Sequence, residues 1–251
     1  MLIDYKIEGK DISQLEYGTS NAKTITISFY VRASVTGTFC LNIRNDDANR
    51  QYVKEYTINS ANTWERKELT FPGAPSGTWD EDNTTGLVLM WFLSGDTDSP
   101  SETGRLVTGN QWNNSVTTNT YTSNQSDALT KTSGNTFDIT GVQLEVGDTA
   151  TPFEHLSFGE ELALCQRYCC VLGSGSGDAG SNRFYSGQYG GSGAMVRVWF
   201  PVTMRDIPNL TYTLGGNGVV DTDFSSKDCI QLFDASDTAW RIYDVLAEKE
   251  L

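Results

Sequence analysis

The sequence predicts a mostly β protein with one long helix and two β-rich parts. Short runs of alternating apolar and polar residues recur along the chain, clusters of Gly, Asn and Ser separate them, and one helical pattern interrupts them. The composition agrees with this fold class, since aromatic and turn-forming residues are abundant. The 251 residues include 24 Gly, 11 Tyr, 11 Phe and 6 Trp, and only 20% are charged.

The first part of the chain contains the clearest strand patterns. Residues 24–31 alternate, and one face holds the apolar side chains Ile25, Ile27, Phe29 and Val31. This pattern is typical of a half-buried strand. Similar runs follow at 39–43, 52–58, 64–71 and 87–93. The last run, LVLMWFL, is apolar on both faces, so we expect it at the centre of a packed structure.

Residues 108–134 lack periodicity, which predicts long loops. A further strand pattern follows at 137–146, FDITGVQLEV, in which Phe137 and Ile139 share one phase. Beyond Gly141 the apolar residues shift to the opposite phase. An extra residue at a glycine is typical of a β-bulge, so we expect a bulge at this glycine.

A helix is predicted at 157–173. Ser157 and Glu160 have the spacing of a capping box, and Gly173 ends the pattern. One apolar stripe consists of Phe158, Leu162, Cys165, Cys169 and Leu172. A second stripe consists of Leu164, Tyr168 and Val171. Because two stripes exceed what one small domain covers, we expect the helix to pack between both domains or against copies of itself, with the second stripe as the oligomer contact.

These patterns divide the chain into a first domain at 1–156, a connecting helix at 157–173 and a C-terminal β domain at 174–251. Strands of the last domain are expected at 195–200, 210–214, 230–233 and 239–245. No internal repeat of fixed period is visible, which argues against a solenoid or a long parallel β-helix.

The charge balance excludes several classes of partner. There are 32 Asp and Glu against 18 Lys and Arg, a net charge of −14, so nucleic acid would be repelled. No stretch approaches the roughly 18 apolar residues that a membrane span requires, and we expect neither membrane insertion nor a signal peptide. The five cysteines do not form a disulfide framework, so we expect free thiols and assembly in a reducing cytoplasm.

The segment 136–155, TFDITGVQLEVGDTATPFEH, runs into SFGEELALCQRY at 157–168 and resembles a junction in tail-fibre and other virion-associated proteins of bacteriophages, especially marine ones. Upstream, ITISFYVRAS and NTWERKELTFPG are similar to a jelly-roll module related to carbohydrate-binding modules. Downstream, VWFPVTMRDIPNL and WRIYDVLAEKEL resemble the small domain that follows in those proteins. The resemblance covers nearly the whole chain. It implies a jelly-roll β-sandwich, a trimerising helix and a small β domain.

The resemblance also implies a function. We expect a structural protein of the virion, a tail fibre or fibre-like appendage, that is homotrimeric, contacts other virion proteins and attaches the particle to host-surface glycans. Such a protein is assembled in the host cytoplasm and located on the virion. Two alternatives stay open, a capsid decoration or cement protein without a ligand and a glycan-degrading fibre.

One departure from the resembling proteins concerns the first strands. In those modules further strands precede the segment that matches Ile7-Glu8-Gly9. We therefore expect either an abbreviated sandwich or one that another chain completes.

Exposed aromatic rings are the natural candidates for glycan binding, because they stack on the apolar faces of sugars. Trp112 and Tyr121 lie in the polar loop region, and Trp79 lies beside a run of acidic residues, so we expect these three rings to contact the ligand. Trp64 and Trp91 fall in strand patterns and are expected in the core. A second candidate for adsorption is a tip of the C-terminal domain formed by Phe184, Tyr185, Tyr189 and Trp240, although for Trp240 packing within its strand is favoured.

We expect no enzymatic activity and no catalytic residues. His155, the sole histidine, lies in a linker without a nucleophile elbow, and no pair of carboxylates is singled out. The run 80–83, Asp-Glu-Asp-Asn, offers oxygen ligands for a structural calcium ion, although a solvated acidic turn is favoured. The helical thiols and one histidine do not supply the four ligands of a zinc site, so no other metal or cofactor is expected.

Overall fold

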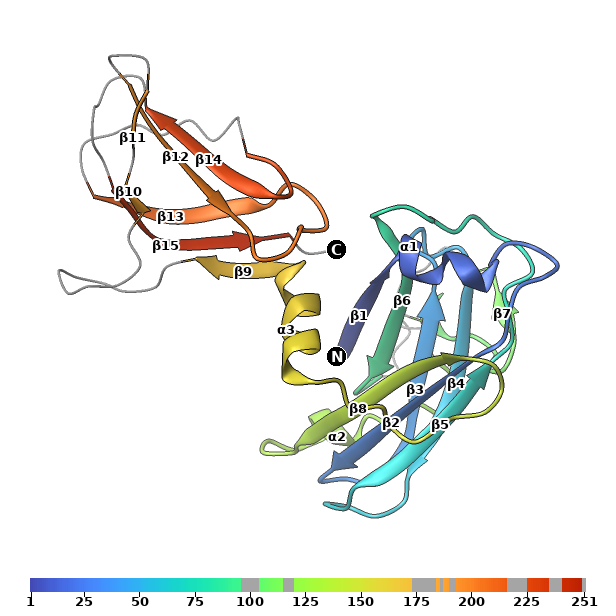
Figure 1. The fold of residues 1–251 in the computed structure, drawn as a ribbon. Helices are drawn as coiled ribbons and strands as arrows, with labels where there is room; N and C mark the ends of the chain where they lie inside the picture. Colours follow the sequence, from blue (N-terminus) through green and yellow to red (C-terminus); the bar gives the residue numbers. More distant parts are fainter. Residues whose placement is uncertain are drawn as a thin grey trace. The chain divides into compact units, whose positions relative to one another are not determined.

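The computed structural model describes residues 1–95, 104–114, 120–172, 184–185, 187–189, 193–215, 225–234 and 241–249. The chain divides into two compact units, Met1–Glu154 and His155–Glu250. Both units are built mainly from antiparallel strands (Figure 1), so the predicted mostly β fold is confirmed.

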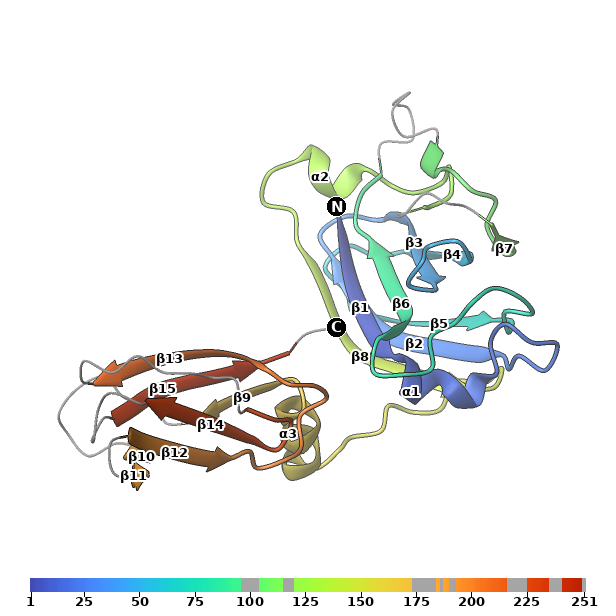
Figure 2. The same cartoon turned by 90° about the horizontal axis from the view of Figure 1, so that it is seen from above.

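The first unit is a sandwich of two sheets that face each other (Figures 1 and 2). Sheet A contains, in order, β1 (Leu2–Glu8), β6 (Thr85–Phe92), β3 (Gly37–Arg44), β4 (Gln51–Ile58) and β7 (Trp112–Asn113). Sheet B contains, in order, β5 (Glu65–Phe71), β2 (Ile25–Ala33) and β8 (Phe137–Val146). This unit also contains the short helix α1 (Gly9–Ile12), the 3-10 turn η1 (Ser13–Leu15) and the short helix α2 (Ala128–Lys131).

The alternation of β2 produces the core that it predicts. Its four alternate apolar residues, from Ile25 to Val31, are fully buried between the sheets. Phe29 anchors this core, with its ring edge-on to Tyr56 at 5.2 Å and to Trp91 at 5.8 Å. All eight residues of β6 are buried, which confirms the expectation drawn from its two apolar faces.

The predicted bulge in β8 is confirmed at Gly141. The register along β2 shifts between Ser28, which pairs with Gln143, and Tyr30, which pairs with Thr140. Gly141 has φ +57°, a left-handed conformation that glycine adopts without strain. A Cβ at this position would also lie 3.1 Å from the Tyr30 ring. The bulge therefore requires glycine both for its backbone angle and for the packing above it.

The second unit contains α3 (Phe158–Gln166) and two small antiparallel sheets. One sheet contains β9 (Cys169–Leu172), β10 (Phe184–Tyr185), β13 (Asn209–Gly215) and β15 (Arg241–Glu248). The other contains β11 (Gly187–Tyr189), β12 (Gly193–Trp199) and β14 (Cys229–Asp234). Residues from both sheets form one core, which includes Cys170, Val196, Ile230, Leu232 and Val245.

The predicted helix is correct at its start and wrong at its end. Ser157 and Glu160 form the predicted capping box, with the Ser157 backbone N–H donating to the Glu160 carboxylate at 3.0 Å. The helix stops at Gln166 rather than at residue 173. Residues beyond Tyr168 instead pair with β15 as strand β9, which places Cys170 in the core. An open sheet edge thus overrides the helical spacing of the apolar residues.

A single carboxylate organises the turn between β4 and β5. Glu65 accepts hydrogen bonds from the backbone N–H groups of Asn59 and Ser60, both at 2.8 Å, and from Lys67 Nζ at 2.6 Å. Burial raises the pKa of Glu65, but these hydrogen bonds outweigh it and hold the pKa at about 2, below the ordinary 4.5.

This pKa predicts an acid-dependent loss of stability. Because the folded-state pKa of Glu65 is lowered, its stabilising contribution is complete above pH 4.5 and is lost as the pH falls toward 2. We expect Glu65→Gln to lower the thermal midpoint at neutral pH and to flatten its fall over this range, measured by circular dichroism. Glu81→Gln, at an exposed position, serves as the control. A Glu65→Gln profile as steep as the wild-type profile would contradict the assignment.

Candidate functional site

Two of the three rings expected to contact a ligand come together in the sandwich. Trp112, on β7, has its ring centroid 5.9 Å from that of Trp79 in an edge-on arrangement. Tyr17 and Tyr52 complete this aromatic cluster, at 6.1 and 5.3 Å from Trp112. Chain segments far apart in sequence therefore build one aromatic cluster beside β4.

Within the aromatic cluster, Trp112 is the ring that reaches the surface. It is half-buried, and its Nε1–H donates to the carbonyl oxygens of Pro72 at 3.2 Å and Gly73 at 3.1 Å. The Arg50 guanidinium lies 5.7 Å from the ring centroid and also donates to the Asn114 side chain. This arrangement holds an indole beside a cation and an amide at the surface of the sandwich.

Trp79 lies beneath this surface. It is buried, its ring meets Tyr17 edge-on at 4.8 Å, and its Nε1–H donates weakly to the Ser76 carbonyl oxygen at 3.4 Å. Burial also raises the pKa of Tyr17 well above its ordinary value. Trp79 and Tyr17 therefore support Trp112 from inside the sandwich rather than offering a face to a ligand.

The structure places Tyr121 in a core, contrary to the expectation that it contacts a ligand. Its side chain is 2% exposed and packs against Phe92 at a centroid distance of 5.2 Å, on the outer face of sheet A. Val88 and Met90 belong to the same apolar cluster. The polar chain around Tyr121 covers this face of the sheet, so the ring has no face free for stacking.

The polar residues near Tyr121 form hydrogen bonds with buried polar groups of sheet A. Asn42 is fully buried, and its Nδ2 donates to Gln51 Oε1 and to the Thr120 carbonyl oxygen, both at 2.9 Å. The Gln125 side chain accepts from the Cys40 backbone N–H at 2.8 Å. Some of the polar residues of this predicted loop region therefore belong to a buried hydrogen-bond network.

Trp64 is an exposed ring that the sequence places in the core. It immediately precedes β5, is 43% exposed and has the Arg32 guanidinium 5.0 Å from its ring centroid. Arg32 in turn pairs with Asp138 at 3.0 Å. The preceding turn, rather than the strand, sets the orientation of Trp64. The expectation for Trp91 is confirmed, since it is 2% exposed.

The described residues contain no group of three or more His, Cys, Asp or Glu side chains placed to hold a metal ion. In the acidic run at 80–83, burial and the nearby charges of Asp82, Asp47 and Asp46 raise the pKa of Asp80. The Asp82 carboxylate accepts a hydrogen bond from the Thr84 backbone N–H at 2.7 Å within the turn. His155 lies exposed before α3, and the five cysteines are free.

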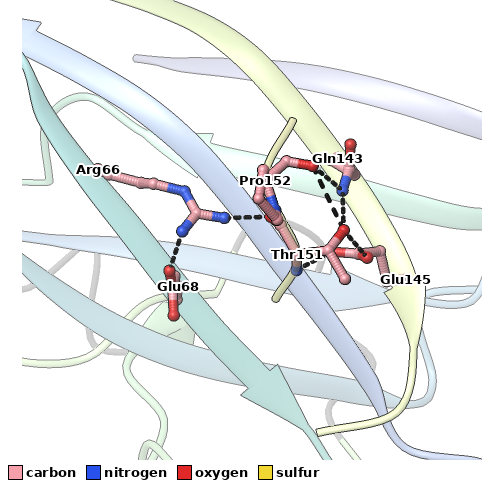
Figure 3. A network of polar contacts seen from close by, with 6 residues as sticks. All are labelled: Arg66, Glu68, Gln143, Glu145, Thr151 and Pro152. Carbon is pink, nitrogen blue, oxygen red and sulfur yellow. Dashed lines mark hydrogen bonds and ion pairs between the residues drawn. The ribbon is translucent and has the colours of Figure 1, made fainter. Parts of the chain in front are cut away.

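The segment after β8, residues 148–154, crosses the outer face of sheet B as a strap (Figure 3). Glu145 accepts from the Thr151 backbone N–H at 3.0 Å and from its hydroxyl at 2.6 Å. Gln143 donates to Thr151 Oγ1 at 3.1 Å and accepts from the Glu154 N–H at 2.8 Å. Arg66, which pairs with Glu68, donates to the Thr151 carbonyl oxygen. The polar side chains of the QLEVGDTATPFE segment thus serve hydrogen bonds within the sandwich.

The second unit exposes apolar side chains on more than one face of its helix and just before it, and we call these residues together the α3 surface. Its residues are Leu156, Phe158, Leu162 and Leu164. Phe158 is 80% exposed and Leu164 is 54% exposed, and no residue of α3 is buried. A shallow pocket of 420 Å³ lies against the helix and is lined by Leu156, Glu160, Ala163, Leu164, Arg167, Val202 and Thr203.

The three residues expected as oligomer contacts do not form one helical stripe. Leu164 lies on α3 and lines the pocket. Tyr168 follows the helix, where it is half-buried with the Arg205 guanidinium 6.0 Å from its ring centroid. Val171 is exposed on β9. The stripe is broken because the helix ends before Tyr168.

The expected second aromatic cluster is only partly within the structure. Strands β10 and β11 contain Phe184, Tyr185 and Tyr189, but the side chains of these residues and all of Trp240 lie outside the described residues.

Across the described ranges, no helix is long and apolar enough to cross a membrane. Comparisons with family models, curated proteins and solved structures found no match.

Proposed function

We propose that this chain is a structural protein of a bacteriophage virion, a tail fibre or fibre-like appendage, that assembles as an oligomer and attaches to host-surface glycans. The α3 surface is the observation that carries the proposal. A nine-residue helix without a buried side chain gains little stability from its own unit. Burial of its apolar residues against other copies supplies that stability, and virion appendages are assemblies of repeated copies.

The pocket beside α3 supports this mode of assembly. Its volume of 420 Å³ accommodates an aromatic side chain, and the same helix presents the exposed ring of Phe158. Insertion of Phe158 from one copy into the pocket of the next is a head-to-tail contact, which closes into a ring when the rotation between copies permits it. A trimer is the smallest ring beyond the dimer. Other virion proteins then bind the assembled oligomer.

Attachment is assigned to the surface of the aromatic cluster at Trp112. We expect Trp112→Ala to weaken adsorption of the purified protein to host cells about tenfold or more, a typical loss for a central aromatic contact. Trp64→Ala removes the other exposed indole of the sandwich and serves as the matched control. Adsorption is measured with fluorescently labelled protein, and circular dichroism checks that both variants are folded. Loss of adsorption in Trp64→Ala alone would move the site to Trp64.

A capsid decoration or cement protein without a ligand is the second candidate. The burial of Trp79 and Tyr121 favours it, because two of the three expected rings have no face for a sugar. A density map of the intact particle separates the candidates by locating the protein on the tail or on the capsid. We also propose that the protein binds glycans without cleaving them. Release of reducing sugar ends from host envelopes would contradict this absence of cleavage.

A further inference from the structure

A tryptophan on β12 of the second unit lies on the outward face of its sheet. Val196 belongs to the core of this unit, and Val198 packs against that core. Because side chains alternate along a strand, Arg197 and Trp199 point to the opposite face. Trp199 is 64% exposed, more than any other tryptophan whose side chain the structure describes. The indole therefore offers a ring face to solvent.

An amide group orients the arginine that shares this face. Arg197 is exposed and pairs across the sheet with Gln231, whose Oε1 accepts hydrogen bonds from Arg197 Nε at 2.9 Å and from Nη2. Among the residues that the structure describes, no carboxylate forms an ion pair with this guanidinium. The nearby Asp228 carboxylate accepts from Thr203 Oγ1 at 2.6 Å. Arg197 thus keeps an unneutralised charge and further N–H donors on its terminal nitrogens.

The same three kinds of side chain occur together at Trp112 in the sandwich. The Arg50 guanidinium lies beside that indole and donates to the Asn114 side-chain oxygen. In the described part of the chain, Arg50 also forms no ion pair with a carboxylate. The chain contains 32 acidic and 18 basic residues. Even so, both surfaces keep an arginine whose charge no neighbouring acid neutralises.

We propose that Trp199 and Arg197 form a second glycan-binding site, with Gln231 as a positioning residue, and that the ligand is an acidic saccharide containing a carboxylate-bearing sugar. This inference rests on the glycan attachment proposed above and names its substrate class. An exposed indole stacks on the apolar face of a sugar ring. A guanidinium binds a carboxylate through two parallel N–H donors. The sugar carboxylate pairs with Arg197 while the sugar ring covers Trp199.

The surroundings of Trp199 favour a saccharide over a protein partner. Its described neighbours on the outward face, Arg197 and Gln231, are polar, and its cross-strand partner Cys229 is small and buried. Protein interfaces instead centre on a buried apolar patch. One ring among polar groups matches a sugar, which has an apolar face and polar edges.

The charge of the site favours an acidic saccharide over a neutral one, because a neutral sugar would leave the guanidinium charge of Arg197 unpaired. The net charge of −14 repels polyanions at long range. Physiological salt screens exposed charges separated by more than about 8 Å. The adjacent arginine therefore contributes more to the contact than distant acidic residues do.

Fluorine NMR of the whole chain labelled with 5-fluorotryptophan tests the site. The chain contains six tryptophans, and Trp199→Phe assigns the Trp199 signal by its loss. The probes are trimers of galacturonic acid and of mannuronic acid, two uronic acids of different stereochemistry. We expect at least one trimer to shift the Trp199 signal in a saturable way. The neutral methyl ester of that trimer is expected to bind about tenfold more weakly or worse.

Two variants make the test specific to the charge of the site. Arg197→Gln removes the charge, and we expect it to weaken binding of the acidic trimer about tenfold or more while binding of the methyl ester stays unchanged. Lys249→Gln removes one positive charge just after β15, in the other sheet of the same unit, and is expected to keep the wild-type affinity.

Several results would overturn the second site. These are the absence of a saturable Trp199 shift with both trimers, equal affinity for a trimer and its ester, unchanged affinity in Arg197→Gln, and equal weakening in Lys249→Gln. An oligomer that Trp199→Ala dissociates would assign the ring to a contact between copies and would also overturn the site.

The separate signals of Trp112 and Trp199 allow the two proposals to fail independently. Cell adsorption that Trp112→Ala abolishes, without a shift of the Trp199 signal, would refute the second site and leave the proposed function standing. Binding of an acidic trimer at Trp199 by a protein that does not adsorb to host cells would do the reverse.

Discussion

Substitution of Leu164 by aspartate is expected to convert the proposed oligomer into monomers. Leu164 is 54% exposed on α3 and lines the pocket beside it, so its burial in an assembly places it in a dry contact. A carboxylate there would lose its hydration without gaining a partner, at a cost of several kcal/mol. Because the residue is exposed within its own unit, the fold should persist. Light scattering coupled to gel filtration measures the mass, which is 27.6 kDa for one chain.

The matched control for Leu164→Asp is Thr63→Asp, which adds the same charge at an exposed turn of the sandwich. It is expected to keep the wild-type mass. A wild-type protein that is already monomeric at micromolar concentration would refute assembly through the α3 surface. A Leu164→Asp variant of unchanged mass would show that the oligomer forms elsewhere.

The second large effect is expected at Tyr121. Its replacement by alanine removes a ring that is 2% exposed and packs against Phe92, so we expect a loss of about 3 kcal/mol in the free energy of unfolding. Urea unfolding followed by tryptophan fluorescence measures this loss. Any weakening of cell adsorption in this variant would then follow from instability rather than from a missing ligand contact.

Tyr121→Phe separates packing from the role of the hydroxyl group. It keeps the ring, and we expect a loss well below that of the alanine variant. A Tyr121→Ala protein as stable as the wild type, but defective in adsorption, would return this residue to the binding site and contradict its burial.

Local signals in the sequence predict much of the fold. The alternation of β2, the doubly apolar run of β6 and the phase shift at Gly141 each depend on neighbouring residues only, and all three appear in the structure. The capping box of α3 is local in the same sense. The end of the helix is not, because it depends on β15, which lies more than 70 residues further along the chain.

The candidate site is less predictable for the same reason. Whether a ring faces solvent depends on which segments fold over it. Tyr121 and Trp79 sit among polar residues in the sequence but are buried by distant strands, whereas Trp64 begins a strand and stays exposed. Trp112 is the one expected ligand ring that reaches the surface. Its placement beside Trp79 follows from the pairing of β7 with β4, which no short pattern reveals.

The strap over sheet B has a mechanical consequence. A pull on the chain beyond His155 reaches the sandwich first at residues 148–154, which side chains of Gln143, Glu145 and Arg66 hold. Several hydrogen bonds loaded together must yield before the tension can peel β8 from β2. Under the proposed attachment function, the strap would yield and re-form under tension before the sandwich unfolds.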